Sequence, residues 1–243
     1  MNKKILDIAI PSIISNITVP LLGLVDVTIV GHLGSPVYIG AIAVGGMLFN
    51  MIYWIFGFLR MGTSGMTSQA FGSRDLNEVT RLLLRSTGVG LLIALALLLL
   101  QAPLRWMAFQ FIDASPAVQE SATLYFNICI WGAPAVLALY SFSGWFIGMQ
   151  NARIPMWIAI LQNVVHVGCS WFFAFRCGMG IAGIGYGSVV AQYLGVALAA
   201  VLIVANYREF ITRIDWSAVF DMRPIRRFLV VNRDIIVRTL CIV

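Results

Sequence analysis

The chain has 243 residues, of which 60% are hydrophobic and 11% are charged. A soluble domain carries roughly 45–50% apolar and about 25% charged residues, so this composition excludes a water-soluble globule, and a disordered or fibrous chain as well. With a mean hydropathy of +0.91, the sequence predicts an all-α integral membrane protein. The formal net charge of +6 needs no nucleic-acid partner, because basic residues gather where a membrane protein meets anionic lipid.

Apolar windows long enough to cross a bilayer as helices, which takes roughly 20 residues, follow one another along the chain. They predict a bundle of six transmembrane helices at residues 8–30, 38–59, 79–100, 117–147, 154–175 and 181–205. A seventh window at 228–243 is too short to cross the bilayer. We therefore expect a six-helix membrane lobe over 1–206, a cytoplasmic linker with an amphipathic helix over 207–227, and the truncated start of a seventh helix over 228–243.

Basic residues are distributed unevenly between the two sides of the predicted bundle. If the N-terminus is cytoplasmic, twelve Lys and Arg residues fall on the cytoplasmic side and two, Arg105 and Arg176, on the outer side. The positive-inside rule then predicts a multi-pass protein of the cell (inner or plasma) membrane with its N-terminus in the cytoplasm.

Asp26 is the one acid deep within a predicted span. A carboxylate at the centre of a membrane helix costs about 2.5–3.5 kcal/mol, so it usually faces a cavity or a partner. We expect Asp26 to handle an ion or a proton, and the alternative is a neutral, hydrogen-bonded structural residue. Asn16 falls on the same stripe of the helix, which Pro11 and Pro20 interrupt.

Two further spans carry polar residues. Asn163, His166 and Ser170 share one face of the fifth span, where the histidine is either a satisfied core residue or a group that titrates near neutral pH. Arg60 interrupts the second span and either snorkels to the interface or lines an aqueous cavity. The sequence contains no metalloprotease, nucleophile-elbow or phosphate-loop motif, which argues against an enzyme and against catalytic residues.

Several short strings occur in a fixed order: LVD at 24–26, VGHLG at 30–34, GTS at 62–64, QAFG at 69–72, GAP at 132–134 and GMQNARIPM at 148–156. Together they resemble the N-terminal half of multidrug and toxic compound extrusion (MATE) family transporters. The strings NITVP at 16–20, FLRM at 58–61 and VNRD at 231–234 are most similar to the DNA-damage-inducible protein F branch of that family.

This resemblance implies a transporter of two six-helix lobes around a central cavity, of which the chain supplies one lobe and lacks the C-terminal lobe. It implies secondary active multidrug efflux by antiport, in which small organic compounds, cationic or amphipathic, leave in exchange for H⁺ or Na⁺. No cofactor and no bound metal are implied. By position, Asp26 matches the family's coupling carboxylate, Pro11 its helix-bending proline, and Ser188 a threonine near the ion site.

The fifth span departs from the family pattern. Relatives with a fuller cation site carry Asn and, four residues later, Asp where this chain has His166 and Ser170. Because Na⁺ sites are built from hard oxygen ligands, the missing carboxylate favours H⁺ over Na⁺. We expect proton coupling through Asp26, with His166 influencing its protonation and Asn163, Ser170 and Ser188 nearby. The residues expected on the cavity wall are Asn16, Arg60 and Tyr140.

Other functions stay open beside drug efflux. A flippase of lipid-linked precursors has a related fold, but we expect such a cavity to carry more cationic residues than Arg60 alone. A non-transporting truncated fragment is the other alternative, because residues 228–243 are too few to cross the bilayer. A membrane enzyme has the least support.

Overall fold

The computed structural model describes residues 2–112, 114–208 and 222–242. No β-strand occurs in these ranges, and their regular structure is helical. The helices are α1 (Asn2–Gly31), α2 (Pro36–Ile55), α3 (Phe58–Gly72), α4 (Leu76–Leu99), α5 (Gln101–Phe111), α6 (Pro116–Cys129), a 3₁₀ turn (Ile130–Gly132), α7 (Ala133–Gly148), α8 (Arg153–Trp171), a π-helical turn (Phe172–Arg176), α9 (Ile181–Asn206) and α12 (Met222–Ile242).

Five helical segments among the described residues are long and apolar enough to cross a membrane. They are Pro36–Gly72, Leu76–Leu99, Pro116–Gly148, Arg153–Arg176 and Ile181–Asn206. These segments coincide with the second to the sixth predicted windows, which confirms the all-α membrane fold. The first window coincides with α1, but several side chains of α1 lie outside the described part, so the count of six spans stays a prediction.

Local sequence signals explain where the spans begin. Pro36 and Pro116 stand in the first turn of α2 and α6, where a missing backbone N–H breaks no hydrogen bond and the fixed φ suits the helix. Asp75 caps α4, because its Oδ1 accepts a hydrogen bond from the Glu78 backbone N–H at 3.0 Å. The short connections between spans therefore end in residues that start the next helix.

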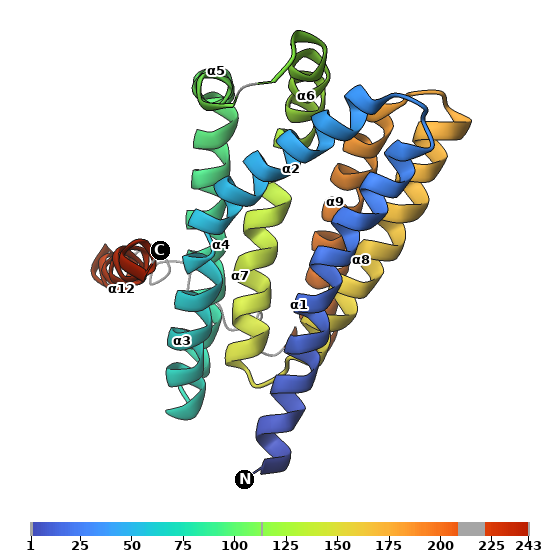
Figure 1. The fold of residues 1–243 in the computed structure, drawn as a ribbon. Coiled ribbons are helices and arrows are strands. Elements are labelled where there is room, and N and C mark those ends of the chain that lie inside the picture. The colour runs from blue at the N-terminus through green and yellow to red at the C-terminus, as the bar shows by residue number, and fades with distance from the viewer. Residues whose placement is uncertain (1, 113, 209–221, 243) are drawn as a thin grey trace.

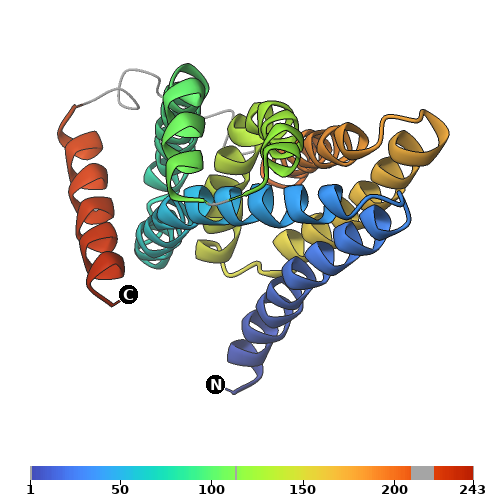
Figure 2. The ribbon, with the colours of Figure 1, turned by 45° about the horizontal axis from the view of Figure 1, so that its top comes forward.

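The spans are arranged as two groups with α2 between them. Figure 1 shows α1, α8 and α9 on one side and α3, α4 and α7 on the other, and α2 crosses diagonally between them. After a rotation of 45°, α2 is seen to run across the front of the bundle (Figure 2). This arrangement leaves the inner faces of both groups facing one another.

Glycines let helices approach closely within each group. Gly144 and Gly148 of α7 face α3, and a Cβ on Gly148 would lie 2.6 Å from Cβ of Thr67. Gly183 of α9 faces the end of the fifth span, where a Cβ would lie 2.6 Å from the Ala174 nitrogen. Small residues spaced four apart are the usual means of close helix packing in membranes, and here they fix α3 on α7 and α9 on α8.

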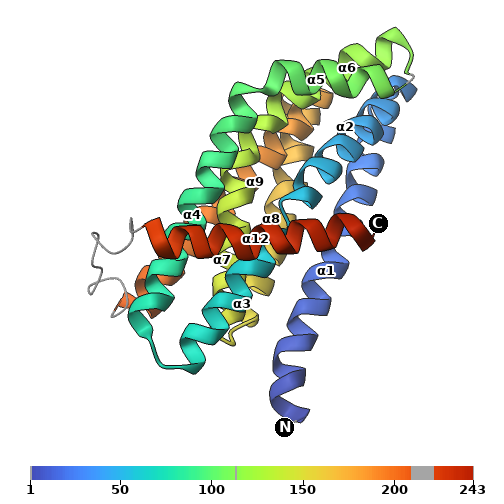
Figure 3. The ribbon, with the colours of Figure 1, turned by 90° about the vertical axis from the view of Figure 1, so that its left-hand side faces the viewer.

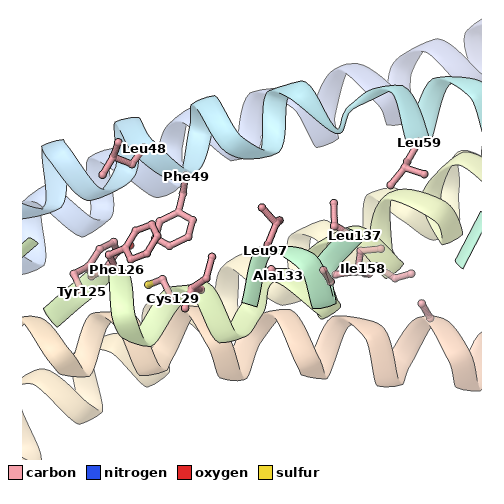
Figure 4. Packing of buried hydrophobic residues seen from close by; sticks show 14 of the residues in the cluster. Leu48, Phe49, Leu59, Leu97, Tyr125, Phe126, Cys129, Ala133, Leu137 and Ile158 are labelled. Atoms are coloured by element: carbon pink, nitrogen blue, oxygen red, sulfur yellow. The ribbon is translucent and has the colours of Figure 1, made fainter. Parts of the chain in front are cut away.

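An aromatic cluster joins α2 to α6 beside the cavity described below. Phe49 stacks on Phe126 with ring centroids 5.2 Å apart and meets Tyr125 edge-on at 6.4 Å. Figure 4 shows these rings together, with Cys129 beside them. Such ring pairs add about 0.5–1.5 kcal/mol each beyond the area that they bury, so they help to hold α2 against α6.

Two helices differ from the sequence expectation. The short helix α5 lies across the end of α4 (Figure 1), between the predicted spans at 79–100 and 117–147. The helix α12 begins at Met222, inside the predicted linker, and crosses α3 (Figure 3) with Phe228 and Asn232 buried. Buried residues four apart and exposed Arg226 and Arg233 make α12 amphipathic, which explains why it lies on the bundle. The amphipathic helix expected in the linker falls on 209–221, outside the described residues.

Candidate functional site

A cavity of about 1120 Å³ lies between the two groups of helices. Ligand pockets usually measure about 300–1,000 Å³, so this space accommodates a drug-sized molecule. Its wall is mostly apolar, formed by residues such as Met47, Phe49, Met61 and Ile147. The charged or polar side chains on the wall include Asp26, Asn50, Tyr53, Arg60, Ser64, Tyr140, Ser143, Gln162, Asn163, His166, Ser188 and Gln192.

Asp26 meets His166 at the wall of this cavity. Asp26 projects from α1 and is 8% exposed, and His166 projects from α8 and is 4% exposed. The Asp26 Oδ1 lies 3.2 Å from the His166 Nε2, which is an ion-pair distance, although the contact lacks the alignment of a hydrogen bond. The carboxylate of α1 and the imidazole of α8 therefore meet in a buried contact at the cavity wall.

Ser188 completes the cluster from α9. Its hydroxyl donates to the Ile184 carbonyl at 3.0 Å, and its Oγ lies 3.2 Å from the His166 Nε2. A serine hydroxyl has one proton to donate, so Oγ accepts from Nε2–H, and this network assigns a proton to Nε2 of the imidazole. The Nε2–H therefore donates to Ser188, while Asp26 Oδ1 lies 3.2 Å from the same nitrogen without the alignment of a hydrogen bond.

The other expected site residues are placed differently. Asn163, Arg60 and Tyr140 lie on the cavity wall. Ser170 does not line the cavity; it is fully buried where α8 meets Gly187 of α9, and its hydroxyl has no hydrogen-bond partner among the described residues. The structure therefore separates Ser170 from the Asp26–His166–Ser188 cluster.

The two remaining site residues of α1, Pro11 and Asn16, lie in its first half. Pro11 is buried within α1, which the structure gives as one uninterrupted helix from Asn2 to Gly31. The side chain of Asn16 lies outside the described part of the structure. The predicted position of Asn16 on the cavity wall stays a prediction.

Gln192 is a polar wall residue that sequence reasoning missed. It follows Ser188 by four positions on α9, so it shares the helix face that points to the cavity. Its Oε1 is buried without a hydrogen-bond partner among the described residues and abuts Gly132. The spacing from Ser188 is the signal that would have found it.

The groups that meet at this site are a carboxylate, an imidazole and a hydroxyl. Within the described residues no group of three or more His, Cys, Asp or Glu side chains is placed to hold a metal ion. Asp26 is the one carboxylate on the cavity wall in the described part. One carboxylate beside one imidazole can bind and release a proton without further ligands.

Comparisons with known proteins point to one family of relatives. The MatE family model matches residues 11–172. The chain is 34% identical to DNA damage-inducible protein F of Escherichia coli K12, covering 98% of this chain and 52% of the relative. It is 26% identical to the probable multidrug resistance protein NorM of Acinetobacter baylyi, covering 79% of this chain and 43% of that protein.

Solved structures show the same fold. A MATE transporter in a bent conformation superposes with a TM-score of 0.87 at 20% identity, over 98% of this chain and 53% of the other. A MOP superfamily transporter from Pyrococcus furiosus superposes with a TM-score of 0.84 at 21% identity, over 98% and 52%. The chain thus spans about half the length of the relatives that it matches.

Proposed function

Since the chain belongs to the MatE family of multi-pass membrane transporters, we propose that it forms the N-terminal lobe of a secondary active multidrug exporter. The cavity of about 1120 Å³ with an apolar wall supports this proposal, because amphipathic organic compounds bind in such spaces. A C-terminal lobe outside this chain would supply the opposite wall. Repeat-built transporters bind substrate between their repeats and move one repeat against the other.

We infer that H⁺ drives export through Asp26. The observation that carries this inference is the buried Asp26 carboxylate on the cavity wall, with its Oδ1 3.2 Å from the His166 Nε2. Protonation of Asp26 removes the charge that attracts an imidazolium, so the contact between α1 and α8 weakens. The helix α1, with Pro11 in its first half, then bends or repacks, shrinks the cavity and releases the compound outward.

Na⁺ coupling is the second candidate for the driving ion. It draws support from the oxygen atoms of Asp26, Asn163 and Ser188, three residues that line the cavity. A Na⁺ site needs several hard oxygen ligands, and Ser170 lies away from this wall. His166, which stands closest to the carboxylate, is a nitrogen donor. These features favour H⁺.

A flippase and an enzyme have weaker support. Arg60 is the one Lys or Arg among the described wall residues, whereas a lipid-linked pyrophosphate would call for several cations. Among the described residues, the charged cluster at the cavity is a single acid–histidine pair. The hydroxyl beside it, that of Ser188, donates its proton to the Ile184 carbonyl and not to the imidazole. We propose transport rather than catalysis.

The orientation of the lobe follows from its charge distribution. We propose that the N-terminus is cytoplasmic, because twelve Lys and Arg residues then fall on the cytoplasmic side. In this orientation the α8–α9 connection, which contains Cys177, faces outward.

The driving ion is tested with the full-length transporter, both lobes present, in proteoliposomes loaded with a fluorescent cation. We expect an imposed pH gradient to drive export in Na⁺-free buffer, and a protonophore to stop it. Export that requires Na⁺ and persists after the pH gradient has collapsed would show that the driving ion is Na⁺.

A further inference from the structure

We propose that Arg60 binds a carboxylate of the transported compound, so that the cavity selects amphipathic compounds that carry an acidic group, zwitterions among them. This inference rests on the proposed transport function and names the substrate class of the same cavity. It begins from a feature that proton coupling leaves unexplained, a guanidinium within a membrane span.

Arg60 is held rigidly at its backbone while its side chain stands at the cavity. It follows the break between α2 and α3, and its side chain is exposed on the cavity wall. Its carbonyl oxygen lies against α7, where a Cβ on Gly144 would come within 2.5 Å of it. The Cα is therefore fixed by helix packing, and Arg60 lines the cavity.

The carboxylate of Asp26 and the guanidinium of Arg60, which both belong to residues of the cavity wall, do not form an ion pair with each other. Asp26 is engaged by His166 at 3.2 Å, whereas within the described residues no acid pairs with Arg60, and its electrostatic neighbour is the hydroxyl of Tyr140. Ionised side chains within membrane spans are costly unless they are paired or lie in a polar cavity. An anionic group in the cavity would supply the missing counter-charge.

A carboxylate on an amphipathic compound fits Arg60 and the side chains around it. The planar fork of a guanidinium matches the two oxygens of a carboxylate. Around it, Met47 and Met61 are 65% and 57% exposed and both stand on the cavity wall. Flexible thioether side chains accommodate varied apolar bodies, so the wall offers one fixed charged contact and an adaptable apolar surface.

The test uses two dyes that differ by one esterified carboxyl group, rhodamine 110 (free carboxyl) and rhodamine 123 (its methyl ester). Equilibrium binding to the full-length transporter is measured by fluorescence anisotropy in neutral phosphatidylcholine vesicles. We expect Arg60→Gln to weaken rhodamine 110 binding about tenfold or more and to change rhodamine 123 binding by less than about twofold. Arg60→Lys should restore part of the rhodamine 110 affinity, because it keeps a point charge.

The experiment also includes a matched control variant, and it distinguishes two other partners that Arg60 could have, an acidic side chain of the other lobe and a lipid phosphate. Arg176→Gln removes a cation that does not line the cavity and should leave both affinities unchanged. Equal losses for the two dyes in Arg60→Gln would show that Arg60 pairs with an acid of the other lobe, and would overturn the proposal. Equal affinities in wild type and Arg60→Gln would overturn it too. Loss of the difference between the dyes on addition of phosphatidylglycerol would assign Arg60 to a lipid phosphate instead.

The result of the dye-binding test can be distinguished from the result of the transport test. Wild-type export of rhodamine 123 driven by a pH gradient tests the transporter and its driving ion, and does not depend on Arg60. The binding difference between the two dyes tests Arg60 and requires no transport. Thermal unfolding of each variant shows whether a lost affinity comes from misfolding.

Discussion

At the scale of single residues, the coupling proposal depends on three side chains from three helices. Asp26 comes from α1, His166 from α8 and Ser188 from α9. Each contact is 3.2 Å long, so a small displacement of α1 breaks the cluster. A charge change at one atom can therefore alter helix packing, as antiport requires.

The two serines of the expected site make a matched pair. We predict that Ser188→Ala slows pH-driven export about threefold to tenfold, because His166 Nε2–H loses its acceptor. Ser170→Ala should leave export unchanged, since that hydroxyl has no hydrogen-bond partner among the described residues. Initial rates in proteoliposomes at equal protein content measure both. Similar rates for the two variants would contradict the assignment of Ser188 to the cluster.

Much of the site could be predicted at this scale, because a polar atom in an apolar span is conspicuous. Asp26 and His166 stand out for that reason, although neither their contact nor its partner Ser188 follows from sequence spacing. Whether Arg60 faced lipid or a cavity could not be decided, since both fit a helix near its break. Gln192 was missed because its position one helical turn after Ser188, which places it on the cavity face, was not considered.

At the scale of elements, close packing between helices holds the cavity wall in place. Gly144 and Gly148 bring α7 against α3, which carries Arg60. On the other side, Gly195 of α9 meets Gln162 of α8, so the helices that hold His166 and Ser188 are also tightly joined. Rigid pairs of this kind let α1 and α2 move against fixed walls.

Gly148→Ala tests the α3–α7 contact. Its methyl group would lie 2.6 Å from Thr67 Cβ and 2.8 Å from the Ser64 carbonyl oxygen, so we predict a loss of about 1–3 kcal/mol from overpacking and a lower Tm in detergent. Gly88→Ala is the control, because nothing lies within 4 Å of the added Cβ, and its Tm should be unchanged or higher. Equal Tm values for the two variants would contradict a close contact at Gly148.

The apolar windows of the sequence predicted where the spans lie, but they did not predict where the helices within the spans are interrupted. The break at Phe56 and Gly57, the 3₁₀ turn at Ile130–Gly132 and the π-helical turn at Phe172–Arg176 lie inside apolar windows, where hydropathy carries no information on backbone geometry. The helices α5 and α12 are amphipathic and lie across the bundle. The predicted apolar windows leave out α5, and the window at 228–243 covers most of α12 but not its start at Met222 or its direction across the bundle.

At the scale of the whole molecule, the chain corresponds to one of two expected lobes. It covers 52% of DNA damage-inducible protein F and 53% of a MATE structure. Because the chain covers about half of these relatives, we propose that a second lobe completes the cavity and that export needs both lobes.

The first whole-molecule prediction concerns size and self-sufficiency. We expect the native polypeptide to have about twice the mass of this chain, as its relatives do, and residues 1–243 alone to show no pH-driven export. Immunoblotting of native membranes measures the mass, and proteoliposomes measure export. A native product of 26.7 kDa that exports as a crosslinkable dimer would contradict the two-lobe chain.

The second concerns orientation. Cys177 is exposed in the α8–α9 connection, which faces outward if the N-terminus is cytoplasmic. A membrane-impermeant maleimide should label wild-type protein in right-side-out vesicles, and Cys177→Ser should lose that label. Labelling of Cys177 only after permeabilisation would reverse the orientation.

The central claim, that Asp26 couples H⁺ to export, is tested most directly by proton release from the purified full-length transporter. When a rhodamine 123 pulse is added in weakly buffered solution, we predict that the wild type releases protons as the dye binds. Asp26→Asn should release none and should lose pH-driven export, while Asp26→Glu retains part of both. An Asp26→Asn protein that releases protons and exports the dye at the wild-type rate would contradict the account.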